Sequence, residues 1–154
     1  MLRISRLTDY GTVVLAHLAR QDAAVSSAAD VASATGLGLP TVSKLLKMLG
    51  KAGLVRSTRG PQGGYRLARE AAEISACDVI DALEGPVSIT DCSSGDRQCD
   101  LESHCHVGTT WQRINVSIRH ALADISLLDL QSESCRVPQF EFAGLRINIE
   151  RKVN

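Results

Sequence analysis

The sequence predicts a mainly α-helical chain, with three helices and one β-hairpin in an N-terminal module and a long helix near the C-terminus. Residues 8–52 carry apolar side chains at three- and four-residue spacings, interrupted by short glycine-containing turns. Two short segments predicted to be strands, 54–57 and 65–67, flank a loop with three glycines and a proline, which is typical of a hairpin. A second apolar repeat begins at Thr109.

The composition predicts a globular chain whose cysteines are reduced. The 154 residues are 44% hydrophobic, without a run of about 18 apolar residues that would span a membrane. The N-terminal residues do not resemble a secretory signal, so we expect a cytoplasmic protein. Five cysteines, an odd number, argue against a disulfide framework and favour metal binding or redox chemistry.

The formal net charge of zero conceals two modules of opposite sign. Residues 31–69 carry seven basic side chains and no acidic one, whereas residues 70–154 carry seven basic and fourteen acidic ones. A basic module attracts nucleic acid and an acidic one repels it. Phosphate contact is the favoured interpretation, and an ordinary solvated basic face is the alternative.

Helical segments over 8–20, 28–35 and 39–52 predict a helix-turn-helix. Ser27 and Asp30 resemble a capping box before the second segment, and Gly36 ends it. Pro40 lies in the first turn of the third segment, where its missing N–H costs nothing. Two short helices joined by a glycine-containing turn are typical of a DNA-reading pair.

The third segment and the hairpin supply the candidate DNA contacts. A buried apolar stripe leaves Thr41, Ser43 and Lys44 for base edges and Lys47 for phosphate. The hairpin is the wing of a winged-helix DNA-binding domain that spans residues 1–70. Arg59 in its loop is the favoured minor-groove contact, although an exposed arginine in an ordinary hairpin is the alternative. Gln62 and Tyr65 complete the predicted DNA-binding set.

The C-terminal half predicts a dimer. A short helix over 75–83, with Cys77 in the core, leads into a cysteine-bearing loop that ends at residue 108. Residues 109–131 carry an apolar seam, including Trp111 and Ile114, that the small module leaves uncovered. We expect a homodimer on a palindromic operator, with an intramolecular core as the alternative. The tail over 132–154 is expected to form one strand or an extended arm of unknown role.

Cys92, Cys99 and Cys105 lie within fourteen residues, a spacing suited to one soft-metal centre. Their gaps exceed those of typical structural zinc sites and leave room for an iron–sulfur cluster. His104 and His106 are local candidates for a fourth ligand, with solvated loop histidines as the alternative. Nucleophilic catalysis would need an activating base and a pocket that the sequence does not indicate, so we do not expect an enzyme.

Four segments together resemble the Rrf2 family of winged-helix regulators, of the IscR and NsrR types. They are LTDYG at 7–11, LGKAGLV at 49–55, RGPQGGY at 59–65 and the three-cysteine loop. The resemblance covers about residues 1–130 and implies a homodimer with crossed long helices and a cluster on the three cysteines. IscR-like members have a histidine where this chain has Gly108, and NsrR-like members use an aspartate, which here corresponds to Asp9. Asp9 therefore ranks above His106 as the fourth ligand.

The resemblance implies a transcriptional repressor of iron–sulfur assembly genes of the SUF type, controlled by a cluster, with [2Fe–2S] slightly favoured over [4Fe–4S]. Nitric-oxide sensing is a variant of this interpretation. The alternatives are a thiol- or zinc-based redox regulator, and a cluster-binding redox protein whose winged helix contacts other proteins. Double-stranded DNA and a second copy are the expected partners, without a membrane or a small-molecule substrate.

Overall fold

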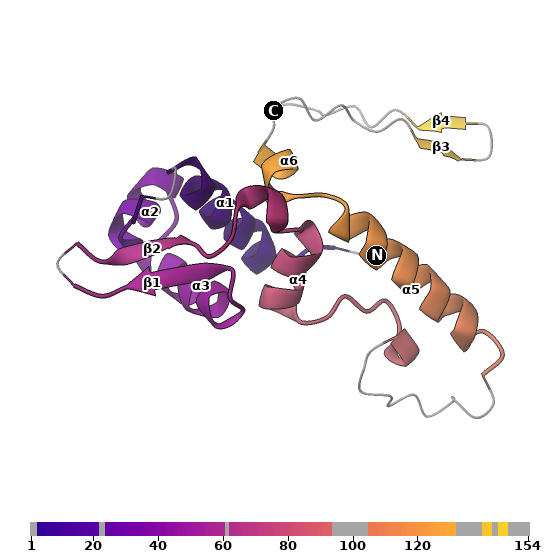
Figure 1. Cartoon of the computed structure of the whole chain (residues 1–154). Helices are drawn as coiled ribbons and strands as arrows, with labels where there is room; N and C mark the ends of the chain where they lie inside the picture. The colour runs from indigo at the N-terminus through magenta and orange to yellow at the C-terminus, as the bar shows by residue number, and fades with distance from the viewer. Residues whose placement is uncertain are drawn as a thin grey trace.

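The computed structural model describes residues 3–21, 24–60, 62–93, 105–131, 140–142 and 145–147 of the chain. Within these ranges the elements follow one another from the N-terminal module to the C-terminal helices (Figure 1). They are α1 (Arg6–Arg20), α2 (Ala28–Thr35), α3 (Leu39–Lys51), β1 (Val55–Thr58), β2 (Gly64–Leu67), η1 (Ala71–Glu73), α4 (Ala76–Glu84), η2 (Asp91–Ser93), α5 (Gly108–Ala123), α6 (Leu127–Gln131), β3 (Phe140–Phe142) and β4 (Leu145–Ile147). The mainly helical winged fold predicted from the sequence is confirmed.

The three N-terminal helices begin and end within two residues of the predicted bounds. Capping residues close in sequence account for this agreement. The capping box of α2 is present: Ser27 Oγ accepts from the Asp30 amide, and the Asp30 carboxylate accepts from the Ser27 amide. Gly36, with φ of 71°, ends the helix in the left-handed conformation that glycine adopts without strain. Pro40 lies in the first turn of α3, as predicted.

The core of the module lies where α1, α2, α3 and α4 meet. Its fully buried side chains include Leu15, Val31, Leu45 and Leu49, each with 0% of its surface exposed. Full burial of such a side chain contributes about 1.5–3 kcal/mol each. Helix α4 contacts both α1 and α3, so the segment after the wing completes this core.

The wing is an antiparallel pair in which Val55 opposes Leu67 and Ser57 opposes Tyr65. Tyr65 also exchanges both main-chain hydrogen bonds with Ser26, at 2.8 and 3.0 Å. The chain before α2 therefore pairs with β2 and ties the wing to the helix-turn-helix.

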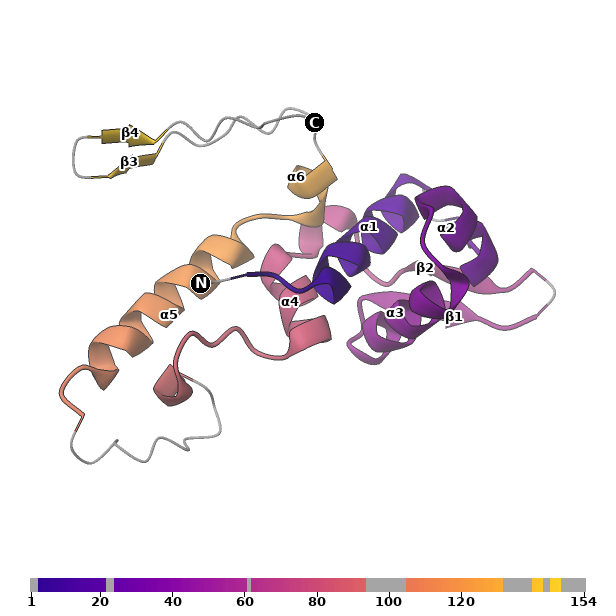
Figure 2. The same ribbon diagram turned by 180° about the vertical axis from the view of Figure 1, so that it is seen from behind.

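The helix predicted over 109–131 is two helices, α5 and α6. Ser126 Oγ accepts from the Asp129 amide at 3.1 Å, and the Asp129 carboxylate accepts from the Ser126 amide at 2.9 Å, so a new helix begins there. The turn is held by main-chain bonds from Ala76 to Ile125 and from Leu127 to Ile74. Helix α5 consequently extends away from the module, as both views show (Figures 1 and 2).

The described part of the tail also differs from the predicted single strand or arm. Strands β3 and β4 pair antiparallel, with Phe140 opposite Ile147 and Phe142 opposite Leu145. Among the described helices, none combines the length and apolar character needed to cross a bilayer.

Candidate nucleic-acid interface and cysteine site

Helix α3 separates its buried and solvent-facing residues as the sequence predicted. Val42, Leu45, Leu46 and Leu49 are fully buried. Of the predicted DNA contacts, Lys44 and Lys47 are exposed, while Thr41 and Ser43 are half-buried. The helix therefore presents cationic side chains and small hydroxyls on its outer side, a chemistry suited to phosphate and base edges.

The predicted wing residues fall into two groups. Arg59 and Gln62 are exposed near the tip of the hairpin. Tyr65 is half-buried, packs against the module's core, and bonds Ser26 through its main chain. Its ring thus contributes to the attachment of the wing, whereas Arg59 and Gln62 are accessible at the tip.

Two of the three predicted cysteine ligands lie among the described residues, close to the N-terminal end of α5. Cys92, in η2, has its thiol 3.2 Å from Thr90 Oγ1, and its carbonyl accepts from Gln112 Nε2 of α5 at 3.1 Å. Cys105 lies three residues before α5. Both thiols are free and half-buried. Cys99 and His104 lie outside the described residues.

Position 108, the first residue of α5, borders the Cys105 thiol. A β-carbon built on Gly108 would lie 3.5 Å from Cys105 Sγ, in ordinary contact. A side chain at this position would therefore stand beside the thiol, and glycine supplies none. This geometry leaves a possible fourth ligand to come from another residue.

The two predicted fourth ligands are placed differently. His106 is exposed next to Cys105 in the chain. Asp9 is exposed in the first turn of α1 and lines a groove with Ile80 and Leu122 that includes neither Cys92 nor Cys105. Within the described ranges, no three His, Cys, Asp or Glu side chains gather in a metal-binding group. Soft thiolates at the positive end of a helix still fit an iron–sulfur centre chemically.

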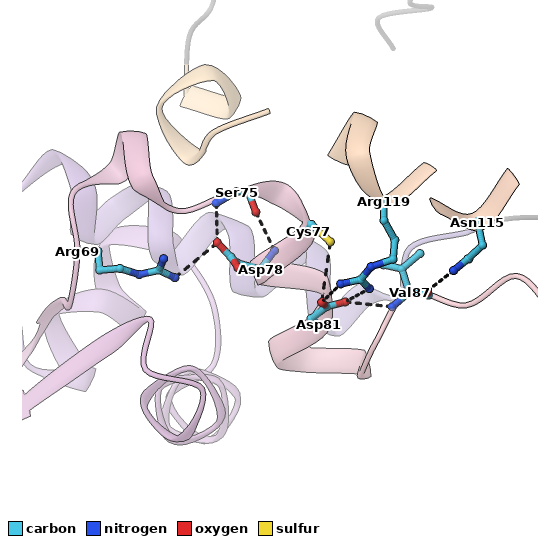
Figure 3. Close-up of polar contacts among 8 residues, drawn as sticks. All are labelled: Arg69, Ser75, Cys77, Asp78, Asp81, Val87, Asn115 and Arg119. Carbon is cyan, nitrogen blue, oxygen red and sulfur yellow. Dashed lines mark hydrogen bonds and ion pairs between the residues drawn. The ribbon is translucent and has the colours of Figure 1, made fainter. Parts of the chain in front are cut away.

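A polar network joins the chain before Cys92 to α4 and α5 (Figure 3). Asn115 is the only buried residue of α5, at 5% exposure. Its amide donates to the Val87 carbonyl and accepts from the Ile89 amide, both at 3.2 Å. These two bonds fix residues 87–89, which we call the stem of the cysteine loop.

Asp81 of α4 is the centre of this network. Its carboxylate accepts two bonds from Arg119 of α5, at 2.7 and 3.0 Å, and one from the Val87 amide at 3.0 Å. Burial alone would raise the pKa of Asp81, but the Arg119 and Val87 hydrogen bonds together outweigh it and lower the pKa. The carboxylate is therefore ionised and links α4, α5 and the stem.

Cys77 lies beside this ion pair. Its thiol is 3.9 Å from Asp81 Oδ2, and 6% of the residue is exposed. Burial and the Asp81 carboxylate raise the pKa of this thiol, so it stays protonated and packs as a small core residue, as predicted.

Sequence reasoning missed the network because its members are far apart in the chain. Asp81 and Arg119 are 38 residues apart, and each alone is an ordinary charged residue on a helix. Leu39 was not among the residues predicted to face DNA, although it lies at the start of α3 and exposes 48% of its surface. An apolar residue before Pro40 at a helix start was the available signal.

The module, the wing and the basic α3 define a winged-helix protein, an architecture used by DNA-binding regulators. A family model described as "Rrf2: Iron-dependent Transcriptional regulator" matches residues 4–133. The chain belongs to the Rrf2 family of transcriptional regulators. The matching relatives are regulators and not enzymes, in agreement with the sequence prediction.

Individual relatives agree with this assignment. The regulator IscR of Vibrio atlanticus (strain LGP32) is 38% identical over 106 residues, 69% of this chain and 61% of that protein. The chain thus spans about three fifths of the length of that relative. Protein rrf2 of Nitratidesulfovibrio vulgaris is 29% identical over 139 residues, 90% of this chain and 93% of that protein.

Solved structures show the same fold. CymR (YrzC), the global cysteine regulator of B. subtilis, has a TM-score of 0.65 at 31% identity, covering 85% of this chain and 97% of that one. IscR of T. potens has a TM-score of 0.62 at 32% identity, covering 84% and 85%.

Proposed function

We propose that the chain is a homodimeric DNA-binding transcriptional regulator whose DNA affinity is controlled by an iron–sulfur cluster on Cys92, Cys99 and Cys105. The observation that carries the proposal is the attachment of Cys92 to the DNA-binding module. The stem of the cysteine loop, residues 87–89, is held by hydrogen bonds to Asn115 and Asp81. Asp81 belongs to α4, which packs on α3. The likeness to IscR-named regulators supports an iron–sulfur cluster over zinc.

The residues around the cysteines would bind and orient the cluster. Thr90 stands beside the Cys92 thiol, and Gln112 holds the Cys92 carbonyl on α5. A bound cluster would supply charge and a covalent tie between the cysteine thiolates; one-electron oxidation would change the charge, whereas release of the cluster would remove both. A displaced stem would then act on α4 through the Val87–Asp81 bond and alter the setting of α3.

The exposed side of α5 supports the homodimer. Trp111 and Ile114, three residues apart on one side of the helix, expose 43% and 39% of their surfaces, although each is a large apolar residue. Contiguous exposed apolar surface marks an interaction site, and a second copy of the same helix is the partner that two-fold symmetry provides. The dimer would present two recognition helices to a palindromic operator.

Asp9 of the partner subunit is the proposed fourth ligand, with His106 as the alternative. Asp9 is exposed and does not share a groove with Cys92 or Cys105 of its own chain, so this proposal requires the cysteine loop of the partner subunit to approach it. Ligation by Asp9 would connect the cluster directly to α1, which packs on α4. SUF-type assembly genes are the proposed targets, repression the proposed action, and [2Fe–2S] the favoured cluster.

Anaerobic purification followed by iron, sulfide and absorption analysis tests the cofactor. We expect iron and acid-labile sulfide in equal amounts, with visible charge-transfer bands that C92S removes. Stoichiometric zinc without visible absorption would contradict the cluster and favour the zinc-based alternative. A colourless, metal-free protein that forms a disulfide with oxidant would favour the thiol-based one.

Substitutions at three positions test the fourth ligand. We expect D9A to shift the visible spectrum and speed cluster loss, while H106A leaves both unchanged. Because position 108 borders Cys105 Sγ, G108H in the D9A background should restore cluster retention. The reverse pattern, with H106A altering the spectrum and D9A silent, would assign the ligand to His106.

A further inference from the structure

Two arginines lie opposite one another in the wing, and neither forms a salt bridge with any residue that the structure describes. Arg56 and Arg66 are opposite each other in the register of β1 and β2, and both are exposed. Like charges directly opposite in an antiparallel pair are destabilising. Their Cα atoms are separated by about 5 Å in such a pair, so the repulsion is built into the register.

No carboxylate among the described residues forms a salt bridge with either arginine. The ion pairs in that part of the chain join Arg69 to Asp78 and Arg119 to Asp81. Glu70 and Glu73 line the same groove as Arg56 and Arg66, and neither makes a salt bridge with them. The free wing therefore bears a cost that an anion between the two guanidinium groups would offset.

The pair continues the basic surface of the recognition helix. Arg56 lines one groove together with Lys47 and Gly50 of α3, and a second groove together with Arg66. Arg56 precedes Arg59, the predicted wing-tip contact, by three residues, or about 10 Å along an extended strand. At 3.4 Å per nucleotide, this corresponds to roughly three nucleotides on one DNA strand.

We propose that Arg56 and Arg66 form a clamp for one backbone phosphate that flanks the base-reading contacts. Two planar guanidinium groups held on neighbouring strands suit the bidentate geometry of phosphate, and arginine loses less hydration than lysine on binding. A phosphate contact positions the protein on the duplex without reading sequence. The clamp rests on the DNA binding proposed above and is independent of the cluster.

Salt dependence tests the clamp directly. Full-length wild type and R56Q/R66Q are titrated onto a labelled 30-base-pair duplex of random sequence between 50 and 200 mM salt. Each lost phosphate contact lowers the slope of log affinity against log salt by about 0.9, or about 1.8 for a dimer. Over this fourfold salt range, the affinity ratio of wild type to variant should shrink about 12-fold.

Two controls separate the clamp from charge alone. R113Q removes a cation from the exposed side of α5 and should leave the slope unchanged. R56K/R66K keeps both charges and should retain the slope while weakening binding, because lysine lacks the planar fork. The melting temperature of free R56Q/R66Q should equal or exceed that of wild type, since a like-charge pair is removed.

Three results would contradict the clamp, and each has a different consequence for the proposed DNA binding. If wild type binds DNA and R56Q/R66Q matches R113Q in slope and affinity, the clamp is wrong and the proposed DNA binding stands. The same titrations on an operator duplex measure sequence preference: if R56Q/R66Q keeps the salt slope but loses the wild-type preference for the operator over the random duplex, the arginines read bases and the clamp is also wrong. If wild type shows no salt-dependent DNA binding, both the clamp and the proposed function fail.

Discussion

Replacement of Asp81 by asparagine tests the network that attaches the cysteine stem to the module. The change keeps the shape of the side chain and removes its charge. An amide has one acceptor oxygen and cannot receive both Arg119 bonds and the Val87 bond of the native carboxylate. We therefore expect D81N to loosen α4, α5 and the stem together.

The magnitude follows from the geometry and exposure of the pair. A hydrogen bond to a charged group contributes about 1.5–3 kcal/mol, whereas an exposed surface pair contributes about 0–1 kcal/mol. The Asp81 and Arg119 side chains are 30% and 36% exposed, so solvent screening places this bidentate pair between those limits. We expect D81N to lower the free energy of unfolding by about 1–2 kcal/mol, or the melting temperature by roughly 2–8 °C.

The effect should depend on pH. Because the pKa of Asp81 is lowered in the folded protein, the carboxylate stabilises the fold above its unfolded pKa of about 3.9. This contribution disappears as pH falls through the folded pKa. Urea unfolding at pH 7 should thus separate wild type from D81N, and the difference should vanish in strong acid.

Asp124 offers a matched control, since it is exposed at the end of α5 and forms no ion pair with a described residue. D124N should unfold like wild type at pH 7. Equal stability of D81N and D124N at pH 7, or a D81N deficit that persists in strong acid, would refute the reasoning.

Three further substitutions test the packing of the module, the wing and the dimer. G11A should destabilise the fold by about 1–3 kcal/mol in urea unfolding, because the added methyl group overlaps Leu83 Cδ1 where α1 meets α4. A variant as stable as wild type would contradict this close approach. G64A places a methyl group 2.5 Å from the Ser26 carbonyl oxygen and should disrupt the main-chain bonds between Ser26 and Tyr65. Hydrogen exchange of these two amides should therefore accelerate, and unchanged protection would contradict the close approach. I114D should convert the dimer to monomer in sedimentation at micromolar concentration. H120D, a control at an exposed polar position on another side of α5, should stay dimeric, and a dimer in both variants would place the interface elsewhere.

Elements set by nearby residues were predictable from the sequence. Ser27 with Asp30, followed by Gly36, defined α2 because caps and left-handed glycines act within a few residues. The same pattern at Ser126 and Asp129 was readable but was obscured by the continuous apolar repeat from Thr109. The apolar periodicity from Thr109 identified exposed apolar residues such as Trp111 and Ile114 but gave no sign of the break between α5 and α6.

The contacts that attach the site to the module were not predictable, because they depend on distant pairing. The bond between Ile89 and Asn115 spans 26 residues, and nothing near either residue indicates the other. The opposition of Arg56 and Arg66 likewise depends on hairpin register, which the charge count could not supply. Local sequence thus predicted where thiols and cations occur, while the fold determines which of them meet.

The central claim is that the cysteine site controls DNA binding. Its most direct test measures the affinity of one protein preparation for the same operator duplex, anaerobically, before and after removal of the cluster by chelation. The account predicts affinities that differ by at least about fivefold for wild type and are equal for C92S. A cluster-loaded wild type with the same affinity before and after chelation would contradict it.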